Sequence, residues 1–461
     1  MRFDSLVPGA PSSVEVTRVD IDSRTCQPGS LFFALPGAVA DGADHVGEAV
    51  RNGAVAVVSW RAVETTVPVM MMAPNEMIPA LASASAAVVG HPEQHATLVG
   101  VTGTNGKTSV VTMVASLCRS LGWPAASIGT LTGARTTPAA PDLFRSLAAS
   151  LDGLSGEGRP VLAMEVSSHA LDQRRVEGLH FAVGAFTNLS HDHLDYHGDM
   201  ESYFAAKARL FEPGRCESSV VWVDDPYGAR LAGMASGEVI PVGRSDAGEV
   251  RLGLDGSRFV WRGIDVASPL LGSFNVDNLL VALAVVSRLG ASDDNLAAAV
   301  TDLTPVPGRF DVVRGTTTVI VDYAHTPDGL RRLLTDVRAL APTSTIVTVF
   351  GCGGDRDREK RPLMGAIAEE CSDYVIVTSD NPRSEDPNAI MDDVLSGITN
   401  KSAVVREPDR RAAIARALAV AGTDDVVVVA GKGHESTQTI GTTVSPFDDR
   451  LVVRELMGAP C

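Results

Sequence analysis

The chain has 461 residues, of which 45% are hydrophobic and 21% charged, and its formal net charge is −17. At roughly 150 residues per domain this length predicts about three domains, and the composition is that of a folded α/β protein rather than a disordered one. A surface this acidic repels phosphate backbones, so we expect no nucleic-acid partner, and a phosphate ligand needs a local basic pocket.

Two further features of the whole chain bear on its compartment. The six cysteines lie far apart, without a CxxC pair, at Cys26, Cys118, Cys216, Cys352, Cys371 and Cys461. This spacing favours a reducing environment over a disulfide framework. The first residues carry no apolar segment typical of a secretory signal, and no later run of about 18 uncharged apolar residues is present. We therefore expect a cytoplasmic protein without stable membrane insertion.

Short β-branched runs alternate with longer Ala/Leu-rich stretches, which indicates α/β layers with mostly parallel sheets. The alternation breaks at GHPEQHA, residues 90–96, and at LTPVPG, residues 303–308. We therefore predict three domains. They are a small N-terminal α/β domain over residues 1–89, a central P-loop-type domain with a mostly parallel sheet over 90–307, and a Rossmann-like C-terminal α/β domain over 308–461.

The first chemical motif is TGTNGKTS, residues 102–109, which follows a predicted strand at 97–101 and precedes a predicted helix that reaches about Leu121. A strand, a glycine loop and a helix N-terminus together form the arrangement that cradles a triphosphate. The generic pattern would place a glycine where this chain has Val101. The alternative is a glycine-rich turn with an exposed lysine, which the strand and helix context disfavours.

Each residue type in this loop has a physical role in phosphate binding. Gly103 and Gly106 permit a tight turn and a close approach of backbone N–H groups to phosphate oxygens. Lys107 supplies a mobile cation for the β and γ phosphates, and Thr108 or Ser109 offers a hydroxyl to Mg²⁺. Nucleotide binding alone leaves kinases, transporters and motors open.

Three further residues of the central part are candidates for chemistry. Glu165 ends a predicted strand at 161–166, and His193 lies in the polar turn after a predicted strand at 183–187. The ends of two strands of one sheet can converge on a ligand. Taken alone, however, Glu165 is also compatible with a surface charge and His193 with a turn histidine. Lys207, in a predicted helical stretch, would by itself be a solvated charge.

In the C-terminal part, three predicted strands end in polar or glycine-rich turns. The strands at 345–350, 374–378 and 426–430 are followed by GCGGDRD, SDNPR and GKGHE. Ligands of open α/β sheets bind at such carboxyl ends. We therefore expect charged side chains to gather at one rim of this domain.

Taken in order, these segments resemble the Mur ligase family. The segments are GTNGKT, EVSSHALDQRRV, TNLSHDHLDYHG, YFAAKARLF, FNVDN and PGRFD, and then YAHTPD, FGCGGDRD, SDNPR and GKGHE. The last four resemble specifically the members that extend UDP-N-acetylmuramoyl-L-alanyl-D-glutamate. The resemblance covers all three predicted domains and implies a monomeric, cytoplasmic, ATP-dependent ligase of peptidoglycan precursor synthesis. In that reaction ATP converts the substrate carboxylate into an acyl phosphate, which the amine of meso-2,6-diaminopimelate attacks.

The resemblance also implies which residues contact the nucleotide and the metal. The implied ATP contacts are Gly103, Thr104, Asn105, Gly106, Lys107, Thr108, Ser109, Asn278 and Arg309. The implied Mg²⁺ ligands are Thr108 or Ser109, Glu165, His193 and Lys207, with Lys207 carbamylated. Such a carbamate turns a cation into an anion that helps to hold the metal and the acyl phosphate. The implied catalytic residues are Lys107, His193 and Lys207.

The implied substrate contacts fall into two groups. Those to the UDP-muramoyl dipeptide are Ser23, Thr136, Thr137, Ser167, Gln173 and Arg175, and Arg175 is the candidate anion clamp. Those to diaminopimelate are Arg356, Asp380, Asn381, Pro382, Arg383, Gly431 and Glu435. Arg383 can hold the carboxylate that distinguishes diaminopimelate from lysine, and Glu435 can hold the distal ammonium.

Three alternatives stay open from the sequence. One is the lysine-adding version of the same ligase. A second is a folylpolyglutamate synthetase, although relatives of that kind typically start at the phosphate loop, without a small N-terminal domain containing DSR. The third is a non-catalytic nucleotide-binding protein, which would not need the set of Lys107, Glu165, His193 and Lys207.

Overall fold

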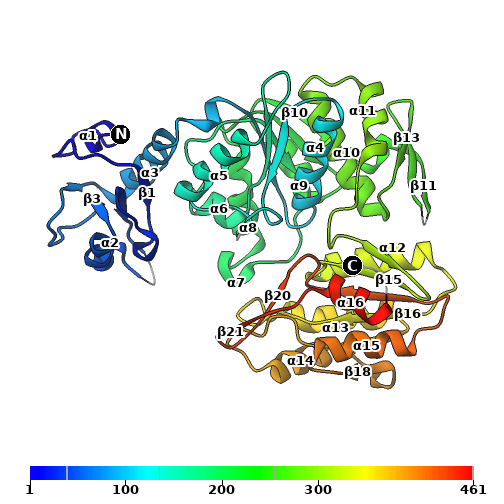
Figure 1. Ribbon diagram of the computed structural model, residues 1–461. Helices are drawn as coiled ribbons and strands as arrows, with labels where there is room; N and C mark the ends of the chain where they lie inside the picture. Colours follow the sequence, from blue (N-terminus) through cyan, green and yellow to red (C-terminus); the bar gives the residue numbers. More distant parts are fainter. Residues whose placement is uncertain (38–39, 134, 254, 459–461) are drawn as a thin grey trace.

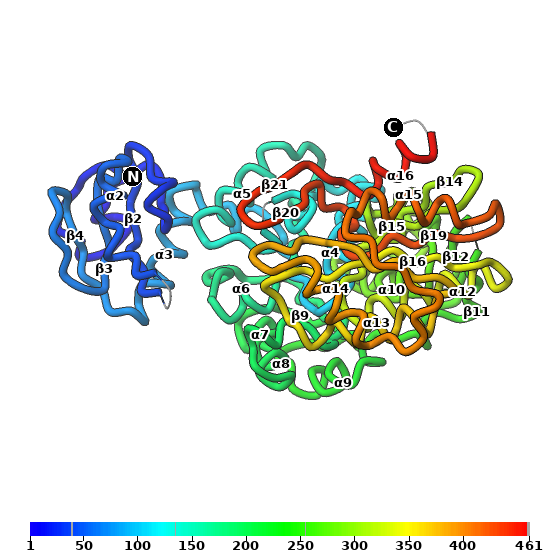
Figure 2. Tube along the Cα trace, turned by 90° about the horizontal axis from the view of Figure 1, so that it is seen from below, coloured from blue at the N-terminus to red at the C-terminus, as the bar shows by residue number. Residues whose placement is uncertain are grey.

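The computed structural model describes residues 1–458, apart from residues 38–39, 134 and 254. Three α/β units follow one another along the chain, with the N-terminal unit at one end of the central unit and the C-terminal unit below it in Figure 1. Figure 2 shows the same elongated arrangement from below. The predicted three-domain α/β fold is therefore confirmed.

The N-terminal unit is built on a small parallel sheet of order β1-β2-β3-β4. Its strands are β1 (Arg18–Asp20), β2 (Ser30–Ala34), β3 (Ala54–Ser59) and β4 (Val69–Met71), and its helices are α1 (Phe3–Leu6), α2 (Val46–Arg51) and α3 (Pro74–Val88). Strands β2 and β3 are buried along almost their whole length. Helix α3 leads into the central unit (Figure 1).

The central unit contains a six-stranded parallel sheet of order β10-β9-β8-β5-β7-β6. Its strands are β5 (Thr97–Thr102), β6 (Ala125–Ile128), β7 (Val161–Glu165), β8 (Phe181–Phe186), β9 (Cys216–Trp222) and β10 (Glu238–Val242). The principal helices are α4 (Lys107–Ser120), α5 (Ala140–Asp152), α6 (Ser168–Asp172), α7 (Leu194–His197), α8 (Met200–Ala208), α9 (Pro226–Ala232), α10 (Ser273–Arg288) and α11 (Asp293–Ala299). Strands β5, β7 and β8 are nearly continuous apolar runs because helices cover both faces of the sheet.

An antiparallel sheet of β11 (Ala247–Gly253), β12 (Gly256–Trp261) and β13 (Ile264–Ser268) packs beside the central sheet. Its Phe259, Trp261 and Val266 share one apolar cluster with α4 and α10. This sheet was not predicted from the sequence.

The C-terminal unit is a doubly wound sheet of order β14-β15-β19-β16-β17-β18, parallel except for β14. Its strands are β14 (Asp311–Arg314), β15 (Thr318–Asp322), β16 (Ile346–Phe350), β17 (Tyr374–Val377), β18 (Val404–Arg406) and β19 (Val426–Ala430). Its helices are α12 (Pro327–Leu340), α13 (Lys360–Cys371), α14 (Pro387–Ser396), α15 (Arg410–Val420) and α16 (Asp449–Met457). Alternate strand residues pack against α12–α14 on one face and against α15 and α16 on the other. A hairpin, β20 (Thr437–Ile440) and β21 (Thr443–Pro446), follows β19.

Two whole-chain expectations can be compared with this fold. The five cysteines within the described residues are free thiols, and Cys461 lies outside the described residues. In the part of the chain that the structure describes, no helix is both long enough and apolar enough to cross a membrane.

Candidate active site

The predicted phosphate loop connects the carboxyl end of β5 to α4, which begins at Lys107. Gly103 and Gly106 have φ angles of +149° and +87°. A Cβ atom at Gly103 would overlap the Thr187 hydroxyl, and one at Gly106 would overlap the Asn278 side chain. Only glycine fits at these two positions, because the loop lies directly against the end of β8 and against α10.

Two lysines hold this loop through the same backbone oxygen. The Lys107 ammonium donates to the carbonyl oxygens of Gly103 and Thr104, each at 2.9 Å. The Lys207 ammonium, only 1% exposed, donates to Gly103 O at 2.7 Å and lies 4.5 Å from the centre of the Tyr203 ring. The interpretation of Lys207 as a solvated charge is therefore wrong, because α8 buries it against the loop. Burial, reinforced by Lys107, lowers its pKa well below the usual lysine value.

Glu165 is also buried, which excludes the interpretation as a surface charge. Its Oε1 accepts hydrogen bonds from the Thr108 hydroxyl at 3.1 Å and from the backbone N–H of Thr130 at 2.8 Å. The carboxylate at the end of β7 is thereby held beside the start of α4. Lys107, Thr108 and Glu165 line one cavity, which we call the reaction cavity.

His193 lines the same cavity from the turn after β8 and has a left-handed backbone, with φ +56°. Burial lowers the pKa of its imidazole to about 3, although Asp192, with Oδ2 3.5 Å from His193 Nε2, acts in the opposite direction. A neutral imidazole retains a lone pair that can bind a metal ion. Lys207 does not line the cavity but contacts the loop from the protein interior.

The described residues contain one set of three candidate ligands with atoms within 4.8 Å of one another: His191, Asp357 and Glu359. The predicted ligands Glu165 and His193 are therefore not drawn together into such a set. Magnesium commonly keeps several waters and needs only one or two protein ligands, so this spacing is compatible with a Mg²⁺ site.

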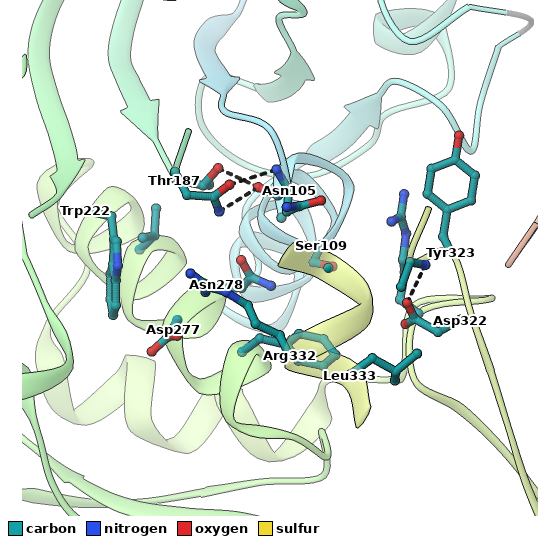
Figure 3. Close-up of a pocket in the computed structure, with 17 residues that line it drawn as sticks. Asn105, Ser109, Thr187, Trp222, Asp277, Asn278, Asp322, Tyr323, Arg332 and Leu333 are labelled. Atoms are coloured by element: carbon teal, nitrogen blue, oxygen red, sulfur yellow. Dashed lines mark hydrogen bonds between the residues drawn. The ribbon is translucent and has the colours of Figure 1, made fainter. Parts of the chain in front are cut away.

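A second cavity opens on the other side of the phosphate loop, between α10 and α12 (Figure 3). Five of the predicted nucleotide contacts line it: Asn105, Gly106, Ser109, Asn278 and Arg309. The other residues of the wall were not among the predicted site residues: Thr187, Asn188, Trp222, Phe274, Asp277, Val281, Asp322, Tyr323, Ala324, Gly329, Arg332 and Leu333. Aromatic surface combined with a few polar groups suits a planar, partly polar ligand such as a nucleobase.

Arg309 connects this second cavity to the reaction cavity, since it lines both. Its guanidinium donates to the Thr108 hydroxyl at 3.2 Å and lies 4.2 Å from the centre of the Tyr323 ring. Within the described residues its buried Nε–H has no hydrogen-bond partner. A buried donor of this kind is available to an anionic ligand.

The opposite wall of the reaction cavity is the expected rim of the C-terminal sheet. Six predicted diaminopimelate contacts line the cavity from the turns after three strands. The turn after β16 provides Arg356, the turn after β17 provides Asp380, Asn381 and Arg383, and the turn after β19 provides Gly431 and Glu435. Pro382, in the same turn, packs so closely on Gly354 that a Cβ there would overlap its carbonyl oxygen. The Asn381 amide donates to Glu435 at 2.8 Å, and Arg383, with φ +52°, donates to Gly354 O at 2.7 Å.

Four of the six residues expected to contact the UDP-muramoyl dipeptide lie along a groove beside the reaction cavity. Thr136, Thr137, Ser167 and Arg175 line this groove together with Arg383 and Glu435. Arg175 donates to Thr137 O at 2.8 Å and to the Gln173 side chain at 3.0 Å, but Gln173 itself does not line the groove.

Ser23 lies apart from all of these residues. It lines a separate cavity between the N-terminal unit and the start of α5, where its hydroxyl donates to Glu48. The sequence-predicted residues thus extend from this cavity, along the groove, to the reaction cavity.

Contacts between the central and C-terminal units were missed by the sequence analysis. His191 contacts Asp357 at 2.8 Å, and the buried Asp192 contacts Lys360 at 3.4 Å and His325 at 3.8 Å. His191, Asp192 and His325 lie within the recognised segments TNLSHDHLDYHG and YAHTPD. The segments mark these residues as candidates, but the sequence does not show which residues of the other unit they contact.

Comparison with known proteins adds three family matches in chain order. Residues 15–101 match the model described as Mur ligase family, catalytic domain, residues 101–286 match the Mur ligase middle domain, and residues 308–433 match the Mur ligase, glutamate ligase domain.

Full-length similarity extends to individual proteins. The chain is 43% identical to a UDP-N-acetylmuramoyl-L-alanyl-D-glutamate–2,6-diaminopimelate ligase of Synechococcus elongatus, with 98% of each sequence covered. It is 42% identical to a ligase of the same name from Xylella fastidiosa, covering 100% of this chain and 98% of the relative. A solved structure of a ligase with that name superposes with a TM-score of 0.67 at 33% identity, covering 99% of both chains.

Proposed function

Because the chain belongs to the Mur ligase family, we propose that it joins meso-2,6-diaminopimelate to the D-glutamate of UDP-N-acetylmuramoyl-L-alanyl-D-glutamate, with ATP as the energy source. The observation that carries this proposal is a single cavity lined by both the phosphate loop, at Lys107 and Thr108, and the turn that ends in Arg383. Activation of a carboxylate and delivery of an amine must occur at one place, and this cavity provides for both.

The phosphate loop fits ATP. Gly103 and Gly106 allow a tight loop in which any Cβ would overlap Thr187 or Asn278, and Lys107 stands at the helix N-terminus, where anions are favoured. The unpartnered donor of Arg309 and the aromatic wall of the second cavity suit the nucleotide's phosphates and base. In the reaction, Lys107 and Arg309 offset the repulsion between the γ phosphate and the substrate carboxylate.

The donor set on this side of the cavity fits Mg²⁺, whose ligands in proteins are chiefly oxygens. Thr108 and Glu165 would supply oxygen ligands, and His193 a neutral nitrogen. When bound, the ion would neutralise charge on the transferring phosphoryl group. The chain's own contribution is to hold the Glu165 carboxylate at the start of α4, through Thr108 and Thr130.

Lys207 is proposed to be carbamylated. Its lowered pKa favours the neutral amine, which can attack carbon dioxide with formation of an N–C bond and loss of a proton. The resulting carbamate keeps one N–H, so it could still donate to Gly103 O. The carboxylate it gains would add negative charge near His193, one of the proposed magnesium ligands, on whose imidazole Lys207 acts electrostatically.

The C-terminal rim suits an amino acid that carries charges of both signs. Arg383 and Arg356 offer guanidinium groups to carboxylates, and Glu435 and Asp380 offer carboxylates to an ammonium group. Every proposed catalytic residue comes from one chain, so we expect the monomer to be active. Since ATP and the nucleotide-linked substrate belong to the cytoplasm, we propose that the enzyme acts there.

The test is direct ligation. Purified protein is incubated with ATP, Mg²⁺ and the UDP-muramoyl dipeptide, and meso-diaminopimelate and L-lysine are offered separately while product mass and ADP are measured. The expected product is the diaminopimelate adduct, with one ADP released for each bond formed. A lysine adduct as the main product would favour the lysine-adding alternative, and no product with either amino acid would favour a nucleotide-binding protein.

A further inference from the structure

Lys432 is completely buried beneath the turns that carry the proposed diaminopimelate contacts, and its side chain has 0% exposure. It lies between Gly431 and Gly433, whose φ angles are +113° and +53°. A Cβ at Gly433 would press against Tyr323 and Gly308 O. This glycine-flanked turn after β19 directs the lysine into the domain rather than into the cavity, so Lys432 is not placed to touch a substrate.

The ammonium group of Lys432 instead contacts three of the side chains that line the reaction cavity. It lies 3.2 Å from Glu435 Oε2, 3.5 Å from Asp380 Oδ1 and 3.4 Å from Asn381 Oδ1. A fourth contact, to the backbone oxygen of Thr437 at 2.7 Å, ties it to β20. The side chains of Glu435 and Asp380 are 31% and 10% exposed. Both carboxylates therefore line the cavity while they contact the same buried ammonium group.

Charge explains why a cation is needed there. Two carboxylates that lie within 3.5 Å of one point repel each other strongly in a poorly solvated site. Lys432 offsets this repulsion, and its contacts fix the direction in which each carboxylate faces. The group of Asp380, Glu435 and Lys432 then carries one net negative charge, which matches one incoming ammonium group.

Strand β20 completes the support of this turn. The Gln438 amide donates to Asp380 O at 2.8 Å, and the backbone N–H of Thr439 donates to Asn381 Oδ1 at 3.0 Å. The backbone N–H of Arg383 donates to Thr439 O in the same strand, and the Arg383 carbonyl oxygen accepts from the N–H of Gly441, directly after the strand. The turn after β17 is therefore held from below by Lys432 and along one edge by β20.

We propose that Lys432 is the positioning residue of the amino-acid site: it orients Glu435, Asp380 and Asn381 to bind the ammonium group of the amino-acid substrate. The inference rests on the proposed function. In this proposal Lys432, the lysine of GKGHE, acts by orienting neighbouring side chains and does not itself contact the substrate.

The experiment is a double-mutant cycle on the full-length enzyme. KM for diaminopimelate, ATP and the UDP-muramoyl dipeptide is measured for wild type, Lys432→Met, Glu435→Gln and the double variant, with Lys401→Met, an exposed lysine of the same domain, as control. We expect Lys432→Met to raise KM for diaminopimelate at least tenfold and to change the other two KM values less than twofold. Because Lys432 acts through Glu435, its effect should shrink to threefold or less in the Glu435→Gln background.

Several outcomes would overturn the positioning role. They are an unchanged KM for diaminopimelate in a folded Lys432→Met enzyme, an equal rise in all three KM values, and effects that multiply fully in the double variant. If Lys432→Met does not fold, the proposal is tested with Gln438→Ala, which removes a hydrogen bond to the same turn. It should raise KM for diaminopimelate several-fold with KM for ATP unchanged, and the absence of that split would overturn the proposal.

The wild-type reaction separates this proposal from the proposed function. If wild type turned over L-lysine instead, only the proposed substrate would fall, because the same KM comparison made with L-lysine still decides the role of Lys432. If wild type ligated neither amino acid, both proposals would fall.

Discussion

Lys107 and Lys207 donate to the same backbone oxygen, Gly103 O, at 2.9 and 2.7 Å. Two ammonium groups on one acceptor repel each other, which is one reason why the pKa of Lys207 is lowered, after its burial. The phosphate loop is thus bracketed by a lysine that lines the reaction cavity and a lysine inside the domain. Variants of each lysine therefore separate the role of the phosphate-facing cation from that of the buried one.

Replacement of Lys107 by alanine should abolish ligation while the fold is kept. Within the described residues the Lys107 ammonium donates hydrogen bonds only to the carbonyl oxygens of Gly103 and Thr104, so its loss removes the cation for the phosphates. We expect turnover to fall by roughly 100-fold or more. ADP release measures the effect, and thermal unfolding serves as the control. Near-normal turnover would contradict the phosphate-loop assignment.

Both Lys207→Ala and Lys207→Arg should be inactive if Lys207 acts as a carbamate. Arginine keeps the positive charge that carbamylation reverses, and it cannot form the carbamate. With ¹³C-labelled bicarbonate, wild type should give a carbamate carbon resonance that both variants lack. A fully active Lys207→Arg enzyme would exclude the carbamate role.

A third prediction concerns the glycine of the loop that precedes α4. Gly106→Ala should raise KM for ATP at least tenfold, because the methyl group would overlap Asn278, in the second cavity, and the backbone at φ +87° is strained for alanine. Gly122→Ala, just beyond the other end of α4 at φ +80°, is the matched control, since no described atom lies within 4 Å of a Cβ there. Equal KM values for ATP in the two variants would argue against the tight cradle.

The sequence predicted those parts of the fold that depend on local pattern. The predicted strand at 426–430 has the same bounds as β19, and that at 97–101 differs from β5 by one residue. Apolar runs followed by glycine turns identify such strands because parallel strands are buried on both faces. The expected gathering of polar turns at the rim of the C-terminal sheet was likewise correct, because the carboxyl ends of parallel strands share one edge.

What could not be predicted depends on contacts between distant segments. The burial of Lys207 and Lys432 contradicts the usual exposure of lysine, and it arises from backbone oxygens and carboxylates supplied by other segments. The contact of His191 with Asp357 joins residues of different units and has no local signature. The hairpin of β20 and β21 was missed because its strands are short and largely exposed, so they lack an apolar period.

The last prediction concerns the choice of amino acid. Diaminopimelate differs from lysine by one carboxylate at its far end, so a selective site must supply a cation there and leave it unsatisfied when lysine enters. Arg383 is placed for this role: it lines the reaction cavity beside Glu435, and β20 and Gly354 hold its backbone and guanidinium.

Loss of this charge-assisted contact in Arg383→Ala should cost roughly 2 to 4 kcal/mol of transition-state stabilisation, which corresponds to a fall in kcat/KM for diaminopimelate of about 30- to 900-fold. L-lysine, which lacks the carboxylate, should be much less affected, so the preference for diaminopimelate should shrink. Since Arg383 has φ +52°, alanine also adds backbone strain, and Arg383→Asn is the matched variant, because asparagine tolerates this conformation. If both variants lowered kcat/KM equally for the two amino acids, Arg383 would support the turn without selecting the substrate.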